Sequence, residues 1–285
     1  RLVLLATILQ GANEEAAMLK GDLAPDPVTA IDLFAGALLP GLMLVVMFII
    51  FIYFYARIFP NSCPPIQTVK SRSEIYKEAF KSIFPPLILI VLVLGSILMG
   101  VATPTESASV GAVGAAIIAL TKGELTFQNL KEVSLNTVKL SSFVFVILIG
   151  ASMFSLVFRG LEGDKILVDM ITASNLTPEM FLISILIVVF VAGFFIDFIE
   201  IIFKIVPVIT PILIALDIDL IWVGIMLAIN LQTSFLTPPF GFSLFYLKSV
   251  SPKEIKTTDI YKGVIPFVII QLLFLIYLFF NPEFI

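Results

Sequence analysis

The chain has 285 residues, of which 59% are hydrophobic and 13% charged, and its mean hydropathy is +1.11. A soluble domain carries about one quarter charged residues, so this composition indicates an integral membrane protein. The net charge of −4 provides no basic surface for nucleic acid, and one cysteine with no histidine excludes a disulfide framework, a cysteine zinc site and histidine general-base chemistry, which makes an enzyme the least favoured class.

The first ten residues, RLVLLATILQ, are mostly apolar, and residues 11–32 carry more acidic than basic side chains. The chain starts with neither a Met nor a signal-peptide pattern, so residues 1–10 read as part of a helix that begins earlier. We therefore expect a fragment of a longer membrane protein, with residues 11–32 outside the cytoplasm because basic loops stay inside.

Several apolar runs are long enough to cross a bilayer core, which takes about 20 helical residues. They are residues 33–55, 84–102, 138–158, 220–247 and 263–280. A shorter run of small residues, 106–120, suits close helix packing. The distribution of Lys and Arg places residues 56–82, 121–139 and 248–262 in the cytoplasm and 159–178 outside.

Two connectors have alternating charged and apolar faces and are predicted to form helices along the cytoplasmic surface. Residues 71–84 open with a capping box, Ser71 and Glu74, and residues 126–140 have a similar pattern.

The stretch GVATPTESASVGA, residues 100–112, is a polar interruption. Thr103 or Thr105 is placed to cap a helix with Pro104 near its start, and Glu106 lies in the first turn, where the macrodipole favours an acid. Two interpretations stay open, a tight turn between helices or a polar element beside a transport path.

Residues 179–216 are apolar but contain Gly193, Asp197, Glu200 and Lys204. Charged side chains facing lipid at mid-depth cost several kcal/mol. Glu200 and Lys204 are spaced to pair on one helix face. The charges either form a stripe at the water interface or mark the buried tip of a hairpin. Loop charges allow both three crossings between 178 and 248 and one crossing with a re-entrant hairpin.

The apolar run 220–247 is interrupted by Thr237, Pro238, Pro239 and Gly241, and Asn230, Thr233 and Ser234 precede the interruption. Proline removes a helical hydrogen bond, so the helix should break there. The end of the first half then suits Na⁺, and the start of the second suits a carboxylate. A proline kink that only shapes packing is the alternative.

Four stretches resemble one family in the same order along the chain: LFAGALLPGLML (33–44), GVATPTESASVGA (100–112), GFFIDFIEIIFKIVPVITPI (193–212) and INLQTSFLTPPFGFSLFYL (229–247). They are similar to the large membrane subunit, DctM-like, of tripartite ATP-independent periplasmic (TRAP) transporters. The resemblance covers the chain from about residue 8 to its end.

The resemblance implies the C-terminal inverted repeat of an elevator-type transporter in the bacterial inner membrane, an all-α fold. It implies a re-entrant hairpin at 179–216 with its tip at Gly193–Asp197, and a broken helix at 220–247 with its break at Thr237–Gly241, which selects the single crossing. The implied parts are the end of a preceding broken helix with a periplasmic loop (1–32), scaffold and arm helices (33–158), a transport-domain half (159–247), and a connector with the last membrane helix (248–285).

Family members are longer, and their first hairpin and first broken helix are absent here apart from a stub at residues 1–10, so we expect either a fragment or a split gene. The expected function is Na⁺-coupled import of a small organic carboxylate, C4-dicarboxylates included, with Na⁺ as the coupling ion and no other cofactor. The implied partners are a DctQ-like small membrane subunit and a DctP-like periplasmic binding protein.

The predicted ion and substrate residues share the tip or the break, with Na⁺ near Thr237 and Gly193: Asn230, Thr233, Ser234, Thr237, Pro238, Gly241, Gly193 and Asp197. Thr103, Thr105 and Glu106 are candidates for a polar path. Two alternatives remain. One is an elevator symporter for divalent anions and Na⁺ that needs no binding protein, and the other is a membrane assembly subunit that does not transport.

Overall fold

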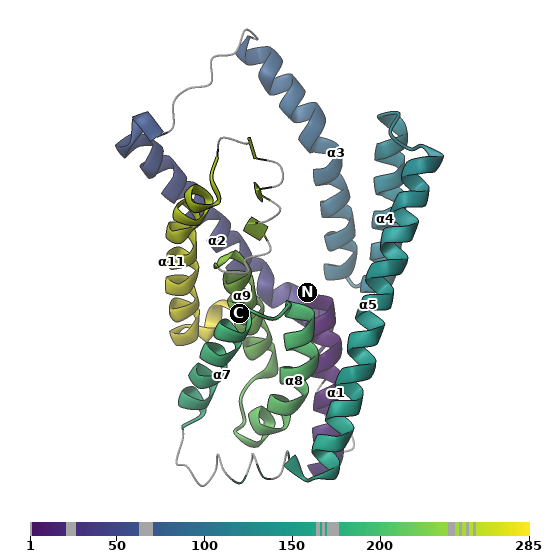
Figure 1. Ribbon diagram of the computed structural model, residues 1–285, viewed down its shortest axis with the longest axis vertical. Helices are drawn as coiled ribbons and strands as arrows, with labels where there is room; N and C mark the ends of the chain where they lie inside the picture. Colours follow the sequence, from purple (N-terminus) through teal and green to yellow (C-terminus); the bar gives the residue numbers. More distant parts are fainter. Residues whose placement is uncertain are drawn as a thin grey trace. The chain divides into compact units, whose positions relative to one another are not determined.

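The computed structural model describes residues 2–20, 27–62, 71–163, 166, 169, 177–238, 243–244, 247–248, 251–252 and 255–285 (Figure 1). Its longer elements are α-helices. In chain order the elements are α1 (Leu2–Lys20), α2 (Ala30–Ile58), η1 (Pro60–Ser62), α3 (Arg72–Leu98), α4 (Pro104–Thr121), α5 (Phe127–Gly160), α7 (Pro178–Ala192), α8 (Phe198–Ala215), α9 (Leu220–Leu236), α11 (Thr257–Phe280) and η2 (Pro282–Phe284).

Five helices of the described residues are long and apolar enough to cross a membrane, namely Ala30–Ile58, Ser73–Leu98, Phe127–Phe158, Phe198–Ala215 and Thr257–Phe280. The prediction of an all-α integral membrane protein is confirmed. Two segments differ from the expected spans. Helix α9 stops at Leu236 and is one of the shorter apolar helices, whereas α8 has the length and hydropathy of a full span.

The two amphipathic connectors are continuous with the membrane helices that follow them. Ser71 and Glu74 form the expected capping box, and α3 then runs on to Leu98 through Pro85 and Pro86. In the same way, α5 is one helix of 34 residues. Separate surface helices at 71–84 and 126–140 are therefore not observed in the described residues.

By compactness the chain divides into two units, Phe51–Phe143 and the combination of Arg1–Ile50 with Val144–Ile285. In the first unit, α3 and α4 pack closely because small residues line their contact. The hydroxyl oxygens of Ser96 and Ser107 are 2.8 Å apart. A Cβ placed on Gly114 would lie 2.3 Å from Leu89 Cδ1, so a larger residue there would require the Leu89 side chain to move.

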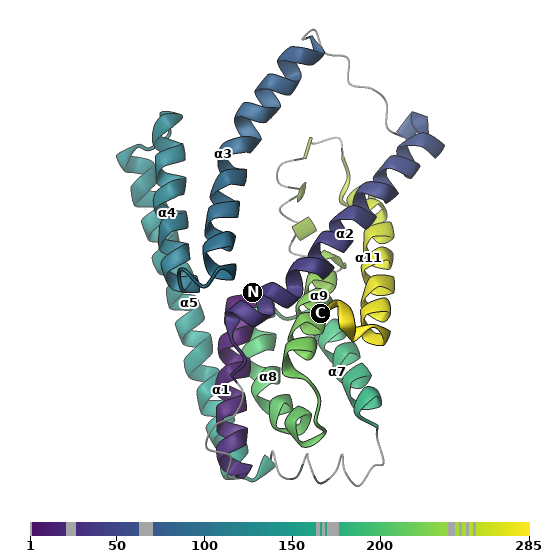
Figure 2. The ribbon, with the colours of Figure 1, turned by 180° about the vertical axis from the view of Figure 1, so that it is seen from behind.

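The second unit is built around α9, which contacts α1, α7, α8 and α11 (Figures 1 and 2). Helix α9 is apolar on nearly all sides, as expected of a helix enclosed by others. Its residues Val223, Ile225, Met226 and Leu227 are fully buried. The predicted division at residues 32, 158 and 247 concerns functional roles and stays a prediction.

Helix α1 lies along α8 and also touches α9, so the N-terminal stretch belongs to the core of this unit (Figure 2). Gly224 of α9 makes the approach possible. A Cβ there would lie 2.6 Å from Leu33 Cδ2 and 3.0 Å from Leu9 Cδ1. The packing places the turn between α7 and α8 beside the last turn of α9.

Candidate functional site

A tight turn joins α7 to α8 at the predicted hairpin tip. Helix α7 ends at Ala192, and the Gly193 N–H donates to Val189 O at 2.9 Å as the helix cap. The Phe195 N–H donates to Ala192 O at 2.9 Å, which closes the turn. Asp197 then adopts extended backbone angles at the N-cap position of α8. The turn therefore presents the C-terminal end of one helix and the N-terminal end of the next.

Gly193 in this turn lies directly against Ser234 of α9. A Cβ on Gly193 would lie 2.2 Å from Ser234 Oγ and 2.6 Å from Ser234 Cβ. Real Cβ atoms do not approach other atoms so closely, so any larger residue at 193 would push α9 and the turn apart. The structure thus brings together two residues that the sequence pattern had assigned to one site from opposite sides.

The last two turns of α9 carry three hydroxyl groups, each of which donates to a carbonyl of its own helix. Thr233 donates to Ile229 O at 2.9 Å, Ser234 to Leu231 O at 3.1 Å, and Thr237 to Thr233 O at 2.8 Å. A hydroxyl has one proton and two lone pairs, so each oxygen keeps only acceptor capacity. At the negative end of a helix, such oxygens suit a cation.

Burial increases the effect of this polar end. Thr233 is 0% and Ser234 1% exposed, while Thr237 is half-buried at the C-cap with an extended backbone. Pro238 follows and has no N–H to continue the helical hydrogen bonds. The first half of the predicted broken helix therefore ends where the sequence indicated, at Thr237.

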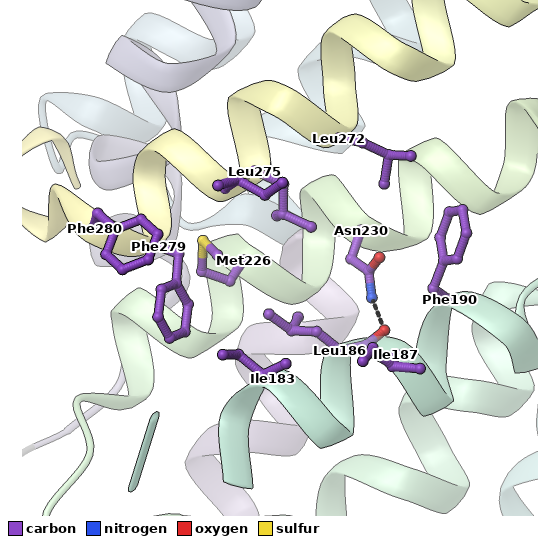
Figure 3. Close-up of a pocket in the computed structure, with 11 residues that line it drawn as sticks. Ile183, Leu186, Ile187, Phe190, Met226, Asn230, Leu272, Leu275, Phe279 and Phe280 are labelled. Carbon is purple, nitrogen blue, oxygen red and sulfur yellow. Dashed lines mark hydrogen bonds between the residues drawn. The ribbon is translucent and has the colours of Figure 1, made fainter. Parts of the chain in front are cut away.

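Asn230 lies nearly two turns before that end and faces α7 (Figure 3). Its side chain is 1% exposed, and its Nδ2 donates to Leu186 O at 2.7 Å. The same side chain borders a groove of about 250 Å³ between α7, α9 and α11 whose other lining residues are apolar, among them Phe190, Met226 and Leu275. The side-chain amide thus already has a partner within the protein.

The charged residues after the tip are partly exposed. Glu200 and Lys204 form the predicted ion pair, with Lys204 Nζ 2.7 Å from Glu200 Oε2. They lie in the first two turns of α8, on the face that does not enter the core. The ion pair therefore lies outside the packed core of this unit.

The polar-path candidates lie in the other compact unit, Phe51–Phe143. Thr103 caps α4, as expected. Glu106 Oε2 accepts from both the Thr103 N–H and the Thr103 hydroxyl at 2.8 Å, and the Thr105 carbonyl accepts from the Ser109 hydroxyl. These bonds are the chemistry of a helix start. A part in a transport path stays a prediction.

Gly241 lies outside the described residues, as does the rest of the second half of the broken helix apart from residues 243–244 and 247. Among the described candidates, Gly193 contacts Ser234, and Thr233 and Thr237 lie on the same end of α9 as Ser234. Sequence reasoning missed the partner of Asn230, because that partner is the backbone carbonyl of an apolar residue. An amide inside an apolar helix was the available signal that some buried partner exists.

A protein-family model described as "Tripartite ATP-independent periplasmic transporter, DctM component" matches residues 26–284. The chain is also 32% identical over 251 residues to the C4-dicarboxylate TRAP transporter large permease protein DctM of Pseudomonas aeruginosa, with 88% of this chain and 57% of that protein covered.

Two relatives from Vibrio cholerae give similar results. The C4-dicarboxylate TRAP transporter large permease protein is 30% identical over 271 residues, covering 88% of this chain and 58% of the relative. The sialic acid TRAP transporter large permease protein SiaM is 27% identical over 238 residues, covering 83% and 54%. The chain therefore spans between half and three fifths of the length of these relatives.

Proposed function

The chain belongs to the DctM component family of TRAP transporters, and we propose that it works as part of a Na⁺-coupled permease that imports a small organic carboxylate. It is a transport component and not an enzyme, and with its membrane-spanning helices it is a multi-pass protein of the bacterial inner membrane. Coupling ion, substrate class and partners are the proposed parts.

The observation that carries the proposal is the contact between the α7–α8 turn and the end of α9. Gly193 touches Ser234, and the hydroxyl oxygens of Thr233 and Thr237 lie on the same helix end with their protons already committed. Acceptor-only oxygens at a negative helix end favour a cation without a strong need for carboxylates. Secondary transporters bind Na⁺ at such interrupted helices. These features support Na⁺ near Thr237 and Gly193.

A carboxylate substrate is proposed to bind beside the cation. The turn directs the N-terminal end of α8 toward the same region, and helix N-termini favour anions. Asp197 at that terminus supplies a negative charge that favours Na⁺ before the substrate arrives. In this scheme Na⁺ orders the turn and offsets the charge of the incoming carboxylate. The names of the relatives, which specify C4-dicarboxylate and sialic acid, support this substrate class.

The α7–α8 pair is proposed to be a re-entrant hairpin of the moving part of an elevator-type transporter. Helix α7 has 15 residues, which gives it a length of about 22 Å against a hydrocarbon core of about 30 Å. Helix α8 has the length of a span, so the support comes from α7 and from the turn that packs inside the unit. One crossing by the residues that follow agrees with the loop charges.

The partners are proposed from the family description, which names a tripartite and periplasmic system. They are a DctQ-like small membrane subunit and a DctP-like substrate-binding protein that delivers the carboxylate. The lipid bilayer that surrounds the membrane helices is the other proposed partner.

Uptake by the complete transporter in proteoliposomes tests the proposal. Labelled succinate and labelled sialic acid are offered with and without a binding protein, under an inward Na⁺ gradient or a choline gradient. Uptake of either that needs both Na⁺ and the binding protein supports the proposal. Na⁺-dependent uptake without a binding protein favours a divalent-anion symporter. Unchanged function after replacement of Thr237, Pro238 and Pro239 by Leu and Ala favours an assembly subunit.

A further inference from the structure

Asn230 of α9 connects two helices of the core. Its Nδ2 donates to Leu186 O at 2.7 Å, and the side chain is 1% exposed (Figure 3). The remaining side chains of the groove it borders are hydrocarbon, apart from the Met226 sulfur. In such surroundings a hydrogen bond is strong, and an amide that loses its partner is costly.

The acceptor is a backbone carbonyl in the middle of α7. A carbonyl oxygen has two lone pairs, so Leu186 O can accept from Asn230 in addition to an N–H of its own helix. The carbonyl is therefore not left unsatisfied when Asn230 moves away, whereas the Asn230 amide is. Loss of the bond therefore weakens the α7–α9 contact, whereas α7 itself stays helical.

From this bond the two helices continue to the same place. About two turns further along α7 is Gly193, and about one turn further along α9 is Ser234. Those two residues are in direct contact, with an added Cβ on Gly193 only 2.2 Å from Ser234 Oγ. The interface of α7 and its turn with α9 is therefore held at two points. One is the hydrogen bond from Asn230 to Leu186 O, and the other is the contact between Gly193 and Ser234.

We propose that Asn230 is a positioning residue: its bond to Leu186 O fixes α7 against α9, holds the Gly193 turn at the end of α9, and so sets the Na⁺ affinity of the site. The inference rests on the proposed function for its Na⁺ readout. It assigns to Asn230 a role that differs from that of an ion ligand, because the bond holds its side chain against α7 about two turns before the tip.

The first test titrates Na⁺ into the purified complete transporter and follows the rise in melting temperature, with choline at constant ionic strength as the reference. Asn230→Leu keeps the shape and burial and removes the bond. Thr210→Val is the matched control, since Thr210 is also 0% exposed but its hydroxyl donates to Val206 O within α8. The Na⁺ concentration at half of the effect is the readout.

We expect Asn230→Leu to raise the half-saturating Na⁺ concentration about threefold to tenfold, as loss of one interhelical hydrogen bond implies. Thr210→Val should stay within about twofold of the parent. A purely structural role lowers the melting temperature without Na⁺ and leaves half-saturation unchanged. That result, or an equal shift in both variants, would overturn the proposal.

A second test needs no Na⁺ response. Cys63, the single cysteine, is replaced by serine, and a cysteine is placed at Ser234, which leaves Gly193 unchanged. The rate at which a maleimide labels this cysteine reports how well the turn covers it. Adding Asn230→Leu should raise the rate at least about threefold, whereas Thr210→Val should not. Equal rates would overturn the positioning role.

Together the tests distinguish a failure of the proposed Na⁺ coupling from a failure of the positioning role of Asn230. If Na⁺ stabilises the parent protein no better than choline, the proposed Na⁺ coupling fails, and the labelling rate alone decides whether Asn230 holds the turn. If Na⁺ stabilises the parent and both Asn230→Leu readouts stay at parent values, the proposed function survives and the positioning role does not.

Discussion

Gly193 in the α7–α8 turn and Ser234 near the end of α9 approach so closely that an added Cβ on Gly193 would lie 2.6 Å from Ser234 Cβ. We therefore predict that Gly193→Ala destabilises the protein by about 1–3 kcal/mol, because the turn and α9 must separate. The apparent melting temperature of the purified complete transporter measures the loss.

Gly263→Ala is the control for this prediction. A Cβ on Gly263 in α11 meets nothing within 4 Å, so the change should be neutral or stabilising by up to about 1 kcal/mol. Ser234→Gly combined with Gly193→Ala should recover part of the stability, since the close contact is then relieved. Equal melting temperatures for Gly193→Ala and Gly263→Ala would show that the turn does not lie where the structure has it.

The residues of this contact could be found from the sequence because they violate its pattern. One apolar run contains Gly193 and Asp197, and another contains hydroxyl residues just before Thr237 and Pro238. Polar groups and interrupted backbone are costly in hydrocarbon, so these features predict sites enclosed by protein. Sequence alone could not show that Gly193 meets Ser234 in particular. Which residues meet depends on the axial positions of α7 and α9 relative to each other, and tertiary packing sets these positions.

Helix boundaries show a different limit. The amphipathic pattern of residues 71–84 and the apolar run 84–102 predicted a border near Phe84 between a surface helix and a membrane helix, but α3 continues through Pro85 and Pro86. Proline removes the hydrogen bonds to carbonyls one turn earlier, here Lys81 and Ser82, and both residues are exposed. Solvent or lipid headgroups can satisfy those carbonyls, so the helix persists where a buried one would break.

Thr237 provides the next prediction. Its hydroxyl donates to Thr233 O at 2.8 Å and leaves its oxygen as an acceptor at the proposed Na⁺ position. Thr237→Ala should raise the Na⁺ concentration for half-maximal uptake about threefold to tenfold, and Thr237→Ser, which keeps the hydroxyl, should stay close to the parent. Uptake in proteoliposomes over a series of Na⁺ concentrations decides this. If alanine and serine behave alike, the hydroxyl is not an ion ligand.

Asp197 is predicted to act through its charge. Its side chain makes no capping bond to α8, so Asp197→Ala should cost little helix stability, yet weaken Na⁺-dependent uptake about tenfold or more in half-saturating Na⁺. Asp219→Ala is the opposite control. The Asp219 carboxylate accepts from the Ile221 and Trp222 N–H groups at 2.7 and 3.0 Å, so its loss should cost about 0.5–2 kcal/mol of stability and leave Na⁺ half-saturation unchanged. If Asp197→Ala lowered stability and left Na⁺-dependent uptake unchanged, Asp197 would not belong to the ion site.

Gln271 of α11 is 0% exposed, and neither polar atom of its amide has a hydrogen-bond partner among the described residues. A buried amide in this condition costs about 1–3 kcal/mol, and methionine has a similar shape without the polar atoms. We predict that Gln271→Met raises the melting temperature, by an amount equivalent to about 1 kcal/mol or more. Gln128→Met, at an exposed position of α5, should change stability by less than about 0.5 kcal/mol. A lower melting temperature for Gln271→Met would instead show that the amide binds a polar group in the assembled transporter.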